Sequence, residues 1–224
     1  MSSARFLAAA LLALTSGAYS APTLSAEDGQ WVVGVSGGTN GIAPEIGLRF
    51  GEHVGIRANG GFFNYSRTEN IDDIDYDGKL KLNSVGLLAD WFPMAGGFRI
   101  SAGVRSNGNK IDLHATPTAN VLVGDVSYTP AQVGNLDGKV EFNSLSPTLT
   151  LGYGGKLGSG FTLGFEAGVV MQGSPKINLA STGGTLSSNA TFLAELEQER
   201  QQAEDDASDF KFWPVVQVHF LYRF

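Results

Sequence analysis

The sequence predicts an all-β membrane protein: an eight-stranded antiparallel up-and-down transmembrane β-barrel with long extracellular loops and a short helix in the last loop. The prediction depends on the final strand, on eight segments of alternating polarity and on unequal connections between them. In the final strand, polar residues separate a row of apolar ones: Val216, Val218, Phe220, Tyr222 and Phe224. A period of two indicates a strand with one apolar face. Such a strand at the end of a soluble sheet invites aggregation, whereas in a barrel it pairs with the first strand and faces lipid.

Eight segments alternate between apolar and polar residues. They cover residues 30–37, 43–50, 54–65, 79–92, 98–111, 139–153, 160–172 and 216–224. Short connections follow the second, fourth and sixth segments, and long ones, 66–78, 112–138 and 173–210, follow the third, fifth and seventh. Outer-membrane barrels have short periplasmic turns and long extracellular loops. An even strand count then puts both termini in the periplasm.

Residues 189–208 of the last loop form the predicted helix. Phe192, Leu193 and Leu196 share one side of it. Its last turn is acidic, with Glu204 and Asp205, which opposes the helix dipole. We therefore expect this end to fray unless packing holds it.

The apolar row changes phase twice, at Asn83-Ser84 and at Asn143-Ser144. Before the first pair the apolar residues have even numbers, as in Leu80 and Leu82, and after it odd numbers, as in Val85. An extra residue in the strand, a β-bulge, would restore the outward face. Alternatively, both segments stand above the membrane, where no outward apolar row is required.

The N-terminus has the three parts of a secretory signal peptide. Arg5 supplies a positive charge, residues 6–14 are apolar, and Ala18 and Ser20 stand at −3 and −1 of a cleavage site. We expect cleavage after Ser20, which leaves residues 21–224 as one barrel domain. About nine apolar residues are too few to span a bilayer, which needs about 20. The alternative is an uncleaved anchor helix.

The composition excludes several classes of site. The chain has no cysteine, so it has neither disulfides nor thiolate metal ligands. Its net charge of −7 argues against a nucleic-acid partner. We expect no cofactor.

Charged residues fall on the inward positions of the predicted strands. They are Glu45, Arg49, Arg57, Asp90, Arg99, Arg105, Glu166 and Arg223, and they are joined by His219. An eight-stranded barrel is just wide enough to be filled by its own side chains, and buried charges require partners. The sequence therefore predicts a salt-bridged lumen that is plugged. The alternatives are a narrow path for ions or small solutes, and a proton relay or catalytic site.

The histidines do not indicate an enzyme. Barrel enzymes that act on lipid A need a histidine with a serine and an acidic partner near the membrane surface. His53 falls in a short turn, His114 in a long loop and His219 in the last strand, and none begins a His-x-Ser pair. We interpret His219 as a hydrogen-bonded lumen residue.

One acidic segment matches half of a calcium loop. Asp73, Asp75 and Asp77 alternate before Gly78, as in the first half of such a loop. The twelfth position is Ser84, where a bidentate glutamate is needed. We therefore predict a solvated turn, with these three aspartates as weak metal candidates.

Several motifs resemble known outer-membrane proteins. The signal peptide, strand count, loop asymmetry and Tyr222-Arg223-Phe224 ending resemble the OmpA transmembrane domain, OmpX and OmpW. Ala89-Asp90-Trp91-Phe92-Pro93 and Gln172-Gly173-Ser174-Pro175-Lys176 look like a proteobacterial outer-membrane family of unassigned function. The resemblance implies a monomer in the outer membrane of a Gram-negative bacterium, in contact with lipid and lipopolysaccharide. During biogenesis it implies periplasmic chaperones and a barrel-assembly machinery that reads the final strand.

Two functions of different classes are compatible with these features. The first is a structural barrel, or one that interacts through its loops. The second is an OmpW-like channel for small or hydrophobic solutes.

Overall fold

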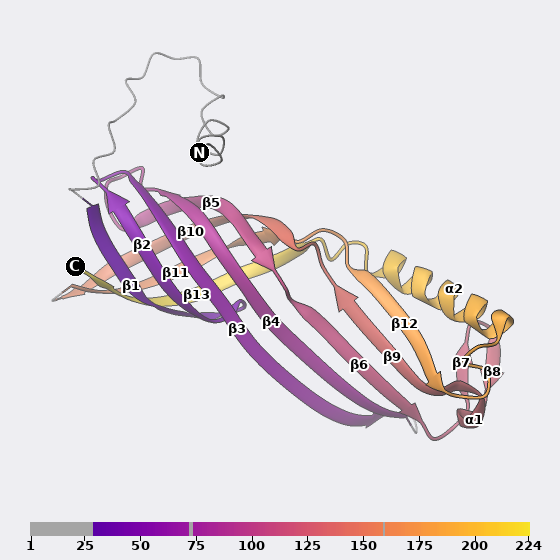
Figure 1. Cartoon of the computed structure of the whole chain (residues 1–224). Helices are drawn as coiled ribbons and strands as arrows, with labels where there is room; N and C mark the ends of the chain where they lie inside the picture. The colour runs from indigo at the N-terminus through magenta and orange to yellow at the C-terminus, as the bar shows by residue number, and fades with distance from the viewer. Residues whose placement is uncertain (1–28, 72–73, 159) are drawn as a thin grey trace, which may run out of the picture.

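The computed structural model describes residues 29–71, 74–158 and 160–224, and its main body is a closed eight-stranded antiparallel β-barrel (Figure 1). Pairing between the last and first strands, from Val32 with Arg223 to Gly38 with Gln217, closes the barrel. The fold class is therefore confirmed. Around the ring the strands are β1 (Gly29–Gly38), β2 (Gly41–Phe50), β3 (Val54–Ile71), β4 (Ile74–Trp91), β5 (Phe98–Asn107), β10 (Leu145–Gly158), β11 (Phe161–Met171) and β13 (Phe212–Arg223). The predicted signal peptide, residues 1–20, lies outside the described residues.

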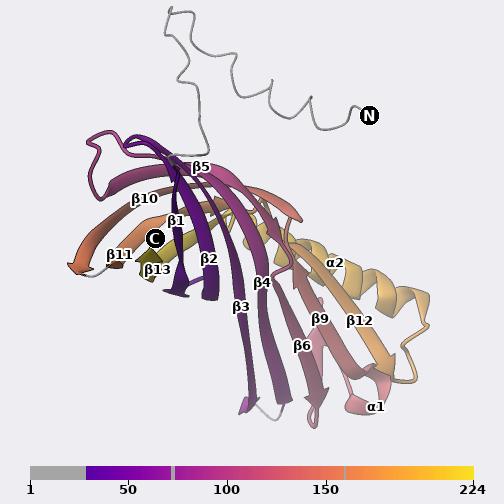
Figure 2. The ribbon, with the colours of Figure 1, turned by 60° about the vertical axis from the view of Figure 1, so that its left-hand side comes forward.

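The same sheet continues beyond the barrel at the end opposite Phe224, and Figure 2 shows β3 and β4 running well past the end of β2. Beyond the barrel β4 pairs with β6 (Lys110–Pro117), β6 with β9 (Gly134–Glu141), and β9 with β12 (Lys176–Gly183). We call β6, β9, β12 and the adjoining halves of β3 and β4 the distal sheet. The three connections predicted as long loops thus contain strands, and that part of the prediction is wrong.

The strand register passes from the barrel into the distal sheet without a shift along β4. Phe62 with Asn83 and Gly61 with Ser84 are consecutive pairs, so the bulge predicted at Asn83-Ser84 is wrong. On the other side of β4, Ser84 pairs with Asn107 and Lys81 with Lys110, three residues further along both strands. At Asn143-Ser144 the chain leaves the ladder between β9 and β10. The change of phase therefore moves the apolar residues of β4 from the outer face in the barrel to the inner face in the distal sheet.

Small elements cover part of the distal sheet. They are β7 (Val121–Val123), β8 (Val126–Tyr128), α1 (Pro130–Val133) and α2 (Ala190–Asp206). Their buried core consists of Val121, Val123, Tyr128, Val133, Phe192 and Leu196, packed on Ile74, Leu136, Leu179 and Leu186. Neither helix in the described part of the chain is long and apolar enough to cross a membrane.

Helix α2 confirms the helix predicted at residues 189–208. Asn189 caps it by accepting hydrogen bonds from the amides of Thr191 (3.0 Å) and Phe192 (3.1 Å). At the acidic end, the Glu204 carboxylate accepts the Ile177 amide of β12 at 2.9 Å, and Arg200 donates to the Ile177 carbonyl at 3.3 Å. These bonds hold the last turn against the edge of the distal sheet, as the packing alternative anticipated.

Candidate functional site

The barrel interior is polar and its outer surface apolar. Val85, Leu151 and Val218 are each more than half exposed on the outside. Inward residues between them, such as Thr150 and Gln217, are buried. This arrangement leaves the lumen as the candidate functional site.

Arg57 lies at the centre of the lumen and contacts three carboxylates. Its guanidinium is 3.3 Å from Glu45, 3.2 Å from Asp90 and 2.8 Å from Glu166. It also donates to the Ser101 hydroxyl at 3.3 Å. Arg57 is 3 % exposed, so these partners replace the water that a cation would otherwise require.

Arg99 and His219 complete this group, which we call the Arg57 cluster. Arg99 lies 2.5 Å from Glu166. His219 Nδ1 is 3.1 Å from Glu45 and its Nε2 is 3.6 Å from Glu166. The cluster thus joins side chains from β2, β3, β4, β5, β11 and β13.

The ion pair between Arg57 and Glu166 crosses the lumen. Their strands, β3 and β11, are four places apart in the ring of eight and are therefore diametrically opposed. An ion pair between neighbouring strands would lie along the wall, whereas this one spans the lumen. At the level of Arg57 the barrel is bridged from wall to wall.

The remaining predicted arginines lie apart from the cluster. Arg105 donates to the Ser84 hydroxyl at 3.0 Å and to the Asn59 amide oxygen at 2.7 Å. At the other end, Arg49 donates to the carbonyls of Ala95 (3.1 Å) and Gly96 (3.3 Å), and its guanidinium stacks on the Phe92 ring at 3.9 Å. Arg49 therefore fastens the turn between β4 and β5.

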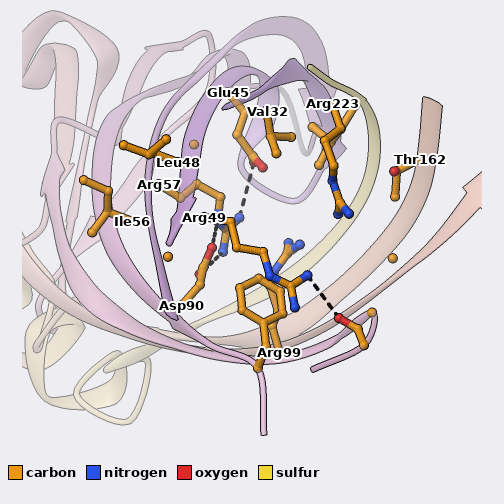
Figure 3. Close-up of a pocket in the computed structure, with 17 residues that line it drawn as sticks. Val32, Glu45, Leu48, Arg49, Ile56, Arg57, Asp90, Arg99, Thr162 and Arg223 are labelled. Carbon is orange, nitrogen blue, oxygen red and sulfur yellow. Dashed lines mark hydrogen bonds and ion pairs between the residues drawn. The ribbon is translucent and has the colours of Figure 1, made fainter. Parts of the chain in front are cut away.

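A small cavity lies beside the Arg57 cluster, and Figure 3 shows Arg49 and Arg223 reaching into it from its walls. Its volume of about 60 Å³ suits a few water molecules. Arg223 is half-buried and stands with Arg49 around a wider hollow of about 410 Å³ at the end of the barrel near Phe224. Water therefore has room at this end of the lumen.

Several uncharged lumen residues were missed by the sequence prediction. Ser101, Ser146 and Thr150 are at most 1 % exposed, and Gln217 is 3 % exposed. All of them stand at inward positions of the same alternation. Their inward positions follow from the sequence, but an uncharged side chain gives no further sign of a functional role.

The two other histidines occupy separate places. His53 Nδ1 is 2.9 Å from the Phe92 carbonyl, in the short turn where it was predicted. His114 lies on β6 and not in a loop, with Nδ1 2.6 Å from an Asp137 oxygen. Neither shares a site with His219.

The candidate calcium aspartates lie on a strand. Asp75 and Asp77 belong to β4, where they accept hydrogen bonds from Asn70 and Thr68. Alternate side chains on a strand are about 7 Å apart, so they do not converge on one ion. Asp73 lies outside the described residues, and those described hold no group of three or more potential ligands. The predicted solvated turn is therefore wrong for the described positions.

The residues of the predicted assembly signal line the outside of β13. Val216, Val218 and Phe220 are about half exposed, and Phe224 is 71 % exposed. The ring centroid of Tyr222 lies 4.9 Å from that of Phe161 and 5.0 Å from that of Phe224. Recognition of this row by an assembly machinery stays a prediction.

Two solved structures share the barrel fold. The chain is similar to CarO2 of Acinetobacter baumannii, with a TM-score of 0.60 and 18 % identity over 88 % of this chain and 98 % of that one. It is also similar to CarO of the same organism, with a TM-score of 0.57 and 20 % identity over 88 % and 97 %. Identities this low show the fold alone. No family model and no curated protein matches the chain, and the resemblance to OmpA, OmpX and OmpW is not confirmed.

Proposed function

We propose that the protein is an integral outer-membrane β-barrel of a Gram-negative bacterium, closed at the Arg57 cluster and acting through its distal sheet as a structural or interaction barrel. The apolar outer surface and closed hydrogen bonding of the barrel suit a bilayer, in which unpaired backbone groups are costly. The distal sheet then projects from the cell, and both termini lie in the periplasm. The barrel is a monomer without enzymatic activity.

The ion pair between Arg57 and Glu166 carries the proposal that the lumen is closed. It connects opposite walls at 2.8 Å, and Glu45 and Asp90 fill the space beside it. A hydrated ion would have to separate these charges in a region without bulk water. Removal of one partner of a buried pair costs about 3–5 kcal/mol, so spontaneous opening is rare.

Planar-bilayer recording tests this closure. We expect no steady current from refolded wild-type protein. Because Arg57→Ala/Glu166→Ala removes the bridge without changing the net charge, it should produce small discrete steps. The matched control, Arg67→Ala/Glu69→Ala, removes an exposed ion pair from the distal sheet and should remain silent. Discrete steps from the wild type would instead support the OmpW-like channel.

The proposed orientation is testable because the chain has no cysteine. Ser188→Cys places a thiol beside α2, and Glu52→Cys places one in the turn between β2 and β3. Both positions are exposed. A membrane-impermeant maleimide should label the first variant in intact cells and the second only after the outer membrane is opened. The reverse pattern would overturn the orientation.

A further inference from the structure

The outer face of the distal sheet sorts its charges by sign. Strand pairing aligns Lys81, Lys110, Glu141 and Lys176 in the row nearest the barrel, and Lys79, Asp112, Lys139 and Asn178 in the next. The third row holds Asp77, His114 and Asp137. Five of the chain's seven lysines lie in the first two rows; the others are Lys156 and Lys211. In a chain of net charge −7, this band of lysines departs from the overall charge.

The lysine band begins where the apolar surface of the barrel ends. On β4, Asn83 is two positions after Lys81, and Val85 is two positions after Asn83, so all three share one face, on which Val85 is 55 % exposed. From Glu141 the same spacing leads through Asn143 to Leu145, which is 63 % exposed. A lipid that covers Val85 and Leu145 with its acyl chains would therefore place its headgroup among the lysines.

A notch interrupts the surface at this height. It lies where the barrel strands β5 and β10 end and the distal strands β6 and β9 begin. Its volume is about 550 Å³. Lys110 and Lys176 line it together with residues 107–109 and 141–145. Its lining combines apolar Leu145 with two cationic side chains, Lys110 and Lys176, and with one carboxylate, Glu141, which forms an ion pair with Lys139.

The charges of the band are not balanced within the protein. Lys81 pairs with Asp112 at 2.8 Å and Lys139 with Glu141 at 2.6 Å. In the described part of the chain, Lys110 and Lys176 have no carboxylate within 4.0 Å. Lys81 and Lys110 are direct cross-strand partners, an arrangement that is destabilising for like charges. An external anion would remove this repulsion.

We propose that the notch and its lysines bind the phosphate groups of lipopolysaccharide in the outer leaflet. This inference rests on the location and orientation of the proposed function. Lysine ammonium groups bind phosphate as point charges, and their alkyl stems extend along the apolar surface. The third row, with Asp77 and Asp137, repels phosphate and so confines it to the lysine band.

Calorimetric titration of the refolded protein in zwitterionic detergent tests the inference. The probes are diphosphorylated lipid A, the same lipid without phosphates, and inorganic phosphate. We expect the phosphorylated lipid to bind at least about 10-fold more tightly than either of the others. Each basic residue near an anionic surface contributes roughly fivefold, so Lys110→Gln and Lys176→Gln should each weaken binding by about that factor. Heat-dependent gel migration confirms that each variant is folded.

Arg67→Gln is the matched control. It removes one positive charge from the distal sheet, but Arg67 lies on the opposite face, as its pairing with Gly78 shows. Affinity of this variant should equal that of the wild type; an equal loss would mean a net-charge effect and overturn the site. Equal binding of the dephosphorylated lipid, or of inorganic phosphate, would also overturn it. Micelle binding does not depend on location in the cell, so failure of the cysteine labelling would affect the proposed function separately.

Discussion

The barrel and the distal sheet use the same strands with opposite polarity. In the barrel part of β4, outward Val85 and Leu87 are exposed and inward Ser84 and Asp90 are buried. In its distal part, outward Lys79 and Lys81 are charged, while Leu82 faces inward and is 6 % exposed. The register with β3 does not change between the two. The hydrophobic residues of β4 therefore lie on its outer face in the barrel and on its inner face in the distal sheet, although its pairing with β3 is regular throughout.

The comparison shows that the surroundings decide which face of a strand is apolar. In the proposed location, the outside of the barrel meets hydrocarbon and the polar side chains turn into the lumen, where they pair. Beyond the bilayer the outside meets water, and the inward side packs against its own helices and hairpin. In the proposed location, the change of phase without a bulge would mark the place where β4 leaves the membrane.

The largest expected difference in stability between the two regions comes from removing one arginine in each. Arg57→Ala should destabilise the barrel by about 3–5 kcal/mol because three buried carboxylates each lose an ion pair, and the one with Arg57 is the only ion pair that the described residues give Asp90. Arg67→Ala in the distal sheet should cost no more than about 1 kcal/mol, because its ion pair with Glu69 is exposed. Urea unfolding in lipid vesicles measures both. Similar costs would mean that the lumen is more hydrated than its burial indicates.

The next largest difference in stability should come from adding a charge to the outer face of each region. Leu151→Lys places a cation on the middle of the barrel surface and should cost about 2–4 kcal/mol in a bilayer. Asn178→Lys adds the same charge to the outer face of the distal sheet, where it should be nearly neutral. The same unfolding assay applies. Equal tolerance at both positions would argue against a lipid-facing barrel surface.

Loss of the α2 cap should affect the distal sheet alone. Asn189→Ala removes the acceptor for the amides of Thr191 and Phe192 and should cost about 0.5–2 kcal/mol. Hydrogen exchange should become faster in α2 while barrel amides keep their protection. Ser188→Ala, at the exposed neighbouring position, serves as the control. Faster exchange throughout the barrel would show that the two regions unfold together.

Acid should loosen α2 slightly. The hydrogen bond from the Ile177 amide, followed by that from Arg200, lowers the pKa of Glu204. Hydrogen bonds from Arg200 and Gln201 lower the pKa of Glu197 from 4.5 to about 2. Because both values are lowered by folding, this stabilisation is complete above pH 4.5 and is lost as the pH falls towards 2. Exchange of α2 amides should accelerate over that range beyond the intrinsic pH effect, and Glu204→Gln should reduce this dependence.

The local features of this protein follow from its sequence alone. Strand alternation predicted eight barrel strands and the inward positions of Arg57, Glu166 and His219, because a strand's two faces follow from its period of two. Side-chain spacing likewise predicted α2. The alternation of β6, as in Lys110-Ile111-Asp112-Leu113, is also present, but an outward row of charged residues does not by itself distinguish a strand from a loop.

Which of these residues come into contact depends on the tertiary structure. Arg57 and Glu166 are 109 positions apart in the sequence, and their pairing depends on the ring closing with β3 opposite β11. The lysine band likewise requires residues of β4, β6, β9 and β12 to align in one register. Alternation specifies the face of each side chain but not its partner across a barrel or along a sheet. Those partners depend on the closure and pairing of strands distant in sequence.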